Sequence, residues 1–174
     1  MLKGQAAGAR WNRTGSAANY LCLPDRPRWK NYVPGWRIDN YAGSLGGVEY
    51  QFYDETSAHY NSPFERVNSG PPGAILNRPA PCAVCYIEKS TTLMIPADTQ
   101  CPMYWRSEYA GYLVSESREH FRSQYLCWDE APEYLPGFEN SNDALVYPVE
   151  TFCGTLPCSK YPTGRELACI VCSK

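Results

Sequence analysis

The stretch PCAVCYIEKSTTLMIPADTQCP, residues 81–102, shows best what kind of fold this 174-residue chain adopts. It holds three of the chain's nine cysteines, and its PCAVCYIEK and TTLMIPA segments favour β-strands. The motif CIVC at 169–172 repeats the spacing of CAVC at 82–85. Alternate residues of a strand face opposite ways, so each motif can send one disulfide to each side of its strand. The likeness also suggests two pseudo-repeat halves, about 1–80 and 81–174, although four residues do not separate a repeat from chance.

Nine cysteines are more than a cytosolic enzyme usually carries. A secreted domain uses disulfides to constrain its unfolded chain, each contributing about 2–4 kcal/mol. Zinc is the alternative, because C-x-x-C spacing also suits a zinc site. Both motifs are filled with Ala, Val and Ile instead of the glycines of zinc knuckles, which favours disulfides. The nine cysteines are Cys22, Cys82, Cys85, Cys101, Cys127, Cys153, Cys158, Cys169 and Cys172.

An odd number of cysteines leaves one unpaired or paired outside the chain. The N-terminal residues MLKGQAAGARW contain no apolar core of a signal peptide. We therefore expect residues 1–174 to form a single cysteine-rich extracellular domain that lacks its N-terminal segment, with one cysteine upstream.

The composition predicts a mostly β fold. Fifteen prolines and thirteen glycines break the chain into short pieces, and 14 tyrosines, five tryptophans and five phenylalanines suit a half-buried pleated surface. We expect a compact, disulfide-stapled antiparallel β domain with long Pro/Gly-rich loops and little helix. Residues 1–20 are expected to form a loop that leads into the first strand. Strands are expected within 18–24, 48–54, 81–89, 91–97, 104–117, 120–128, 144–153 and 166–173.

Charge and hydropathy exclude several functions. The net charge is −2 with no block of like charge, which argues against nucleic acid as a partner. No apolar run approaches the roughly 18 residues of a spanning helix, so we expect no membrane insertion. Only His59 and His120 could serve as catalytic histidines, and neither has an identifiable Ser or Asp partner. We expect no enzyme activity, no cofactor and no metal, with a weak calcium site in the 129–143 loop as the alternative for its carboxylates.

Two surface features stand out. Asn12-Arg13-Thr14 is the only N-glycosylation sequon, which makes Asn12 a candidate acceptor in a secreted chain. Four aromatic residues crowd a Pro/Gly-rich segment, and exposed rings of this kind stack on sugars or on partner side chains. Support of the core from beneath a loop is the alternative. The four residues are Trp29, Tyr32, Trp36 and Tyr41.

Five blocks of the chain resemble a known family: GSAANYLCLP (15–24), PCAVCYIEKSTTLMIPADTQCP (81–102), YAGYLVS (109–115), FCGTLPCSKYP (152–162) and GRELACIVCSK (164–174). They resemble the cysteine-rich C-terminal domain of the invertebrate, sponge-type short-chain collagens, which is distantly similar to the non-collagenous domain of basement-membrane collagen. The resemblance implies an extracellular matrix or secreted protein with a β-rich, oligomer-forming domain, and a family domain that begins earlier with a further cysteine. No Gly-X-Y tract is present, so this chain alone forms no triple helix.

These observations lead to two functional hypotheses. The first is an extracellular structural domain that mediates self-assembly as a homo-oligomer, or association with other matrix proteins. The alternative is a glycan-binding, lectin-like module that uses the aromatic residues on its surface.

Overall fold

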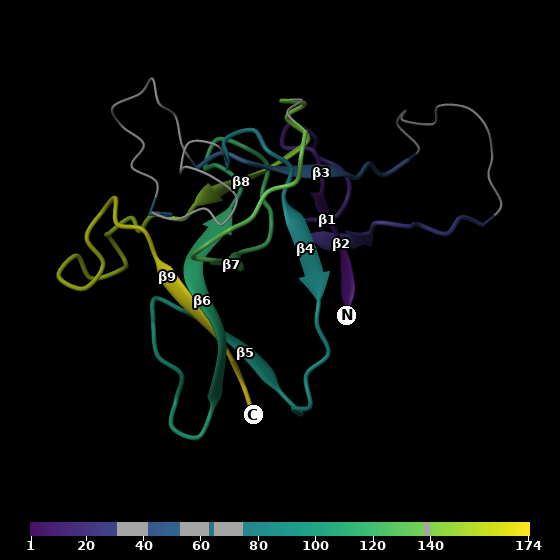
Figure 1. Ribbon diagram of the computed structural model, residues 1–174. Coiled ribbons are helices and arrows are strands. Elements are labelled where there is room, and N and C mark those ends of the chain that lie inside the picture. Colours follow the sequence, from purple (N-terminus) through teal and green to yellow (C-terminus); the bar gives the residue numbers. More distant parts are fainter. Residues whose placement is uncertain (31–41, 53–62, 65–74, 138–139) are drawn as a thin grey trace.

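The computed structural model describes residues 1–30, 42–52, 63–64, 75–137 and 140–174. It confirms the expected mostly β, disulfide-stapled fold: the described residues form nine strands of one curled sheet and no α-helix (Figure 1). The described residues also contain no helix long and apolar enough to cross a membrane. The strands are β1 (Leu2–Gly8), β2 (Leu21–Pro24), β3 (Gly46–Tyr50), β4 (Pro81–Val84), β5 (Thr92–Pro96), β6 (Arg106–Ser115), β7 (Leu126–Asp129), β8 (Ala144–Pro148) and β9 (Ala168–Ser173).

Strand β1 is the centre of a first strand group, which we define as β1, β2 and β4. Antiparallel β2 and β4 lie on either side of β1, so that Gly4 pairs with both Pro24 and Cys82. The disulfide Cys22–Cys82 then joins the two outer strands, with their Cα atoms only 5.7 Å apart. In a flat sheet the two neighbours of a central strand are about 9.6 Å apart. The first strand group is therefore strongly curled around β1.

The expectation of a loop over residues 1–20 was wrong, because residues 2–8 form β1. Strand β1 is hard to recognise in the sequence because β2 lies so close to it that small residues are needed. A Cβ added at Gly4 would lie 1.6 Å from the carbonyl oxygen of Leu23, so this strand needs a residue without a side chain there. Small residues hide the apolar alternation by which a strand is usually recognised.

A second strand group, defined as β6, β7 and β9, is built in the same way. Strand β6 lies between antiparallel β7 and β9, and Gly111 pairs with both Asp129 and Cys169. The disulfide Cys127–Cys169 joins the outer strands, with a Cα–Cα distance of 5.6 Å. A Cβ at Gly111 would lie 1.7 Å from the carbonyl oxygen of Trp128. The strand expected over 120–128 is limited to β7, while β9 confirms a strand in place of a one-sided helix at the C-terminus.

The second strand group has an additional strand. Strand β5 pairs antiparallel with β9 on the side away from β6, and Cys101–Cys172 ties the loop before β6 to β9. Among the described residues, β4 pairs with β1 alone. Because β4 begins at residue 81 and pairs with β1, a division of the chain between 80 and 81 would separate paired strands.

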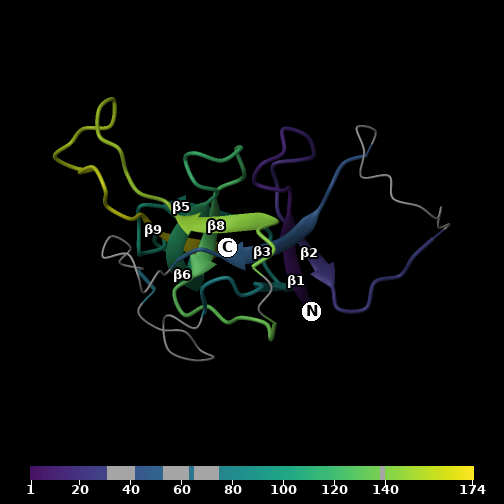
Figure 2. The same cartoon turned by 90° about the horizontal axis from the view of Figure 1, so that it is seen from above.

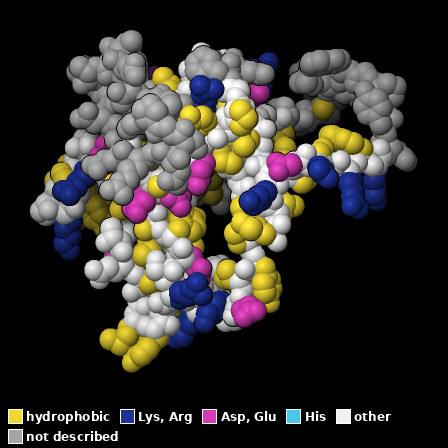
Figure 3. All heavy atoms as spheres, in the orientation of Figure 1, with side chains coloured by type: hydrophobic (Ala, Val, Ile, Leu, Met, Phe, Trp, Pro, Cys, Tyr) yellow, Lys and Arg dark blue, Asp and Glu magenta, His cyan; other side chains and the backbone are white. Residues whose placement is uncertain are grey.

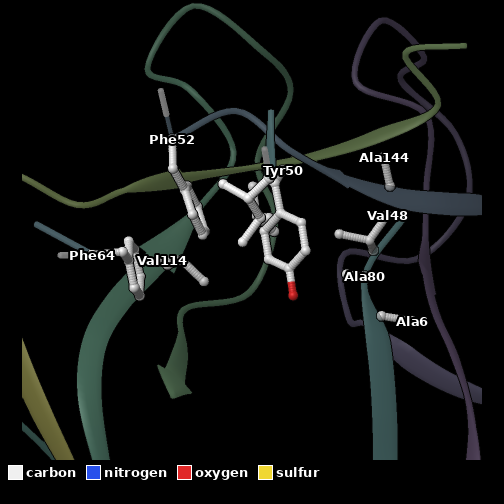
Figure 4. Close-up of a cluster of buried hydrophobic side chains, with 10 residues drawn as sticks. Ala6, Val48, Tyr50, Phe52, Phe64, Ala80, Val114 and Ala144 are labelled. Atoms are coloured by element: carbon white, nitrogen blue, oxygen red, sulfur yellow. The ribbon is translucent and has the colours of Figure 1, made fainter. Parts of the chain in front are cut away.

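The two groups meet along a parallel pair of strands, β3 and β8. Val48 pairs with Ala144 and Tyr50 with Val146, and the main core surrounds this seam (Figure 4). Tyr50 crosses the core, and its hydroxyl donates to the carbonyl oxygen of Glu133 at 2.7 Å. Burial holds the pKa of Tyr50 well above its usual value. The buried core residues come from β1, β3, β6 and β8 and from the part of the chain between β3 and β4: Ala6, Val48, Tyr50, Phe52, Phe64, Ile75, Ala80, Val114, Ala144 and Val146.

Candidate functional site

Eight of the nine cysteines form disulfides. Cys22–Cys82 and Cys127–Cys169 each join the two outer strands within one strand group. Cys101–Cys172 anchors the loop before β6, and Cys153–Cys158 closes a short loop between β8 and β9 that stands out from the sheet (Figure 2). The cysteines of CIVC thus go to two different partners. In CAVC only Cys82 is bridged, and Cys85 is a free, exposed thiol.

The expected aromatic surface is only partly described. Trp29, which follows β2, is 84% exposed, so it is available for stacking on a ligand. Tyr32, Trp36 and Tyr41 lie outside the described residues, as does His59. The structure therefore supports one member of the aromatic set as a surface residue.

A hollow of about 370 Å³ lies between the loops that follow β1 and β6. Two backbone hydrogen bonds join these loops: the Phe121 amide donates to the Trp11 carbonyl at 3.1 Å, and the Gln124 amide donates to the Ala18 carbonyl at 2.8 Å. Residues far apart in the sequence thus share one site. Side chains that line it include Arg13, Thr14, Ser16, His120, Phe121 and Arg122.

His120 contacts an acidic and an aromatic side chain at this site. Its Nδ1 lies 2.8 Å from Oε2 of Glu116, and its ring packs on Trp11 with ring centroids 4.4 Å apart. The other carboxylate oxygen of Glu116 accepts a hydrogen bond from the Leu145 amide at 2.7 Å. Burial raises the pKa of Glu116, and the hydrogen bonds from His120 and Leu145 oppose that rise. These contacts give His120 a structural role in joining the loop after β6 to β8.

The rim of the hollow is basic. Arg13 and Arg122 are exposed, and neither forms an ion pair with a described residue. Guanidinium groups at a hollow suit a carboxylate or sulfate group. Asn12 and His120 can be singled out from the sequence, but Arg13 and Arg122 cannot be recognised there as a pair, because they lie more than a hundred positions apart. Asn12, next to Arg13 in the sequence, is exposed, as a glycan acceptor must be.

Two carboxylates of the 129–143 loop have partners within the protein. Asp129 accepts a hydrogen bond from the Ala131 amide at 2.8 Å, and Asp143 pairs with Arg10 at 3.1 Å. Glu139 lies outside the described residues. The described part of the chain contains no group of three His, Cys, Asp or Glu residues placed to hold a metal ion.

Comparison with known proteins found no protein-family model and no solved structure that matches this chain. The resemblance to short-chain collagens therefore stays a prediction. The structure itself shows a disulfide-rich β domain, of a kind typical of secreted proteins.

Proposed function

We propose that this protein is a secreted structural domain of the extracellular matrix that associates with copies of itself or with other matrix proteins. The observation that carries the proposal is the set of large apolar side chains exposed along the outer strands of the first strand group. On β2, Leu21 is 47% exposed and Leu23 40%. At β4, Val84 is 54% exposed and Tyr86, just beyond the strand, 82%.

Such an edge is suited to association. Outer strands have unpaired backbone groups, and exposed apolar residues beside them favour pairing with another chain. The disulfides hold these strands in place before binding, which lowers the entropy lost on association. On the face seen in Figure 3, hydrophobic side chains reach the surface over β4 and at the turn between β5 and β6. This arrangement supports a binding domain over a catalytic one.

The test is the oligomeric state of the oxidised chain by light scattering over a range of concentrations. We expect a defined oligomer whose dissociation constant rises by roughly tenfold or more when Leu21 and Leu23 are both changed to Ser, because each buries apolar area in the contact. Phe152→Ser is the matched control, since Phe152 is 80% exposed on the separate β8–β9 loop. A chain that stays monomeric at every concentration contradicts the proposal.

A second function is favoured by Trp29 alone, whose ring is almost fully exposed. Under this alternative the domain binds glycans, with Trp29 stacked on the apolar face of a sugar. Trp29→Ala would then abolish binding on a glycan array, whereas Phe152→Ala would leave it unchanged. An array without any bound glycan removes this alternative.

A further inference from the structure

The two strand groups have the same pairing register. In each group a glycine of the central strand faces a cysteine of one outer strand, and the residue two places further on faces a cysteine of the other outer strand. A constant shift in residue number relates each pair of strands: 107 from β1 to β6, 105 from β2 to β7, and 87 from β4 to β9. The residues that define these shifts are Gly4 and Gly111, Cys22 and Cys127, and Cys82 and Cys169.

The correspondence continues beyond the paired strands. An isolated bridge before β4 has a counterpart before β9 at the same shift of 87, and the turn hydrogen bond next to it measures 2.9 Å in both places. The two turn residues that donate these bonds both have positive φ, 57° and 80°. The matching contacts are Glu49–Pro79 with Glu150–Glu166, and Asn77–Tyr50 with Gly164–Thr151.

Under the same shift of 87, Cys85 corresponds to Cys172. Cys172 is fully buried, bonded to Cys101, and paired with Leu93 of β5. Cys85 is exposed and its thiol is free. The neighbouring residues differ in the same way, since Ile170 is 3% exposed whereas its counterpart Ala83 is exposed. In the second strand group, β5 and Cys101 therefore cover the position that is exposed at Cys85 in the first strand group.

We infer that the outer edge of β4 and Cys85 together accept a cysteine-bearing β-strand, equivalent to residues 92–101, from polypeptide that enters β1 at its N-terminal end. In the second strand group this segment runs directly into β6, and Cys101 lies ten residues before Gly111. The equivalent cysteine would lie ten residues before Gly4, outside residues 1–174. The strand would pair antiparallel with β4, as β5 does with β9.

The covalent step is a thiol–disulfide exchange. The two thiols each give up one proton and together two electrons, and a disulfide such as oxidised glutathione accepts them and leaves as two thiols. One S–S bond forms between Cys85 and the incoming cysteine while one S–S bond of the oxidant breaks. The inference shares the β4 edge, with Val84 and Tyr86, with the proposed function, but the two tests are distinct. One measures the bond formed by Cys85, and the other measures the oligomeric state through Leu21 and Leu23 of β2.

The chain itself supplies a probe for the site. A synthetic peptide of residues 90–102, STTLMIPADTQCP, is incubated with chain 1–174 in a glutathione redox buffer. Intact mass and peptide mapping then measure the adduct at Cys85. The controls are a peptide with the same residues scrambled around a fixed cysteine, and the variant Cys85→Ser.

We expect the native-order peptide to form the adduct at least tenfold faster than the scrambled one, and to slow amide hydrogen exchange at residues 82–85. Equal rates for the two peptides, or an adduct without slower exchange, would show a merely reactive thiol and overturn the inference. No adduct at all would overturn it as well.

The source of the strand is tested on the protein as it is produced in its own organism, alkylated and digested without reduction. Cys85 linked to a peptide from the sequence preceding residue 1 supports the inference. Cys85 linked to Cys85 of a second copy, linked to an unrelated protein, or recovered as an alkylated thiol overturns it.

Discussion

The first and second strand groups share a backbone plan but differ in how it is completed. Each has a glycine in its central strand and a disulfide between the outer strands, yet most of the paired side chains differ, as with Gln5 against Tyr112 and Ala7 against Val114. The shared register therefore depends on glycine and cysteine more than on a shared apolar pattern. The second strand group also has β5 and Cys101–Cys172, and the first has an exposed edge at the same place.

The largest effect is expected when the two equivalent disulfides are removed in turn. We expect Cys22→Ala with Cys82→Ala, and Cys127→Ala with Cys169→Ala, each to lower the free energy of unfolding by about 4 kcal/mol, because they close long loops of 60 and 42 residues. The second pair should cost more than loop entropy alone predicts, since Cys127 and Cys169 are buried. Guanidinium unfolding measures both, and a loss confined to one pair would break the equivalence.

The next largest effect is expected from substitution of the two central-strand glycines. Gly4→Ala and Gly111→Ala each force a Cβ against a neighbouring backbone carbonyl, and we expect a loss of about 3 kcal/mol, the upper end of overpacking effects. Gly154→Ala is the control, because a Cβ there has no atom within 4 Å. Thermal or denaturant unfolding measures the losses. Wild-type stability in either variant would mean that the close approach of the strands is not required.

A smaller effect is expected from Cys153–Cys158, which has no counterpart in the described residues of the first half. The two cysteines have a sequence separation of only 5. Cys153→Ser with Cys158→Ser should therefore lower the free energy of unfolding by about 2 kcal/mol or less. Denaturant unfolding next to the two long-loop variants gives the comparison. A loss equal to theirs would show that loop length does not rank these disulfides.

The smallest expected effect depends on pH and concerns Glu116, in the second half of the chain. Glu116 follows β6, and the position equivalent to it after β1 is Ala9. Because burial raises the pKa of Glu116 above 4.5, the folded state holds this proton more tightly than the unfolded state. The resulting stability is present below about pH 4.5 and is lost as the pH rises through the folded pKa.

Glu116→Gln should remove that decline, whereas Glu119→Gln, at a 79% exposed side chain, should keep it. Unfolding curves of the three proteins over a range of pH provide the measurement. Parallel pH profiles for the wild type and Glu116→Gln would show that the pKa of Glu116 is not raised.

Much of this fold follows from the sequence. Strands β5, β6 and β9 were predicted from β-branched and aromatic residues, and the disulfide framework from the cysteine count. Strand β1 was missed because close packing selects Gly and Ala, which leave no periodic pattern. The disulfide pairing was left open because it depends on strands that curl around a glycine, and the Arg13–Arg122 rim because two distant loops form it.

The parallel seam between β3 and β8 has a consequence for biosynthesis. Val48 meets a partner 96 positions later in the chain, so a ribosome must produce almost all of β8 before Tyr50 and Phe52 can be covered. Until then the nascent chain exposes aromatic side chains and an unpaired edge at β3, and contacts this distant in sequence form slowly. Folding after synthesis should therefore be slow, and a non-native cysteine pair that forms before the seam closes has to be exchanged before the native disulfides are complete.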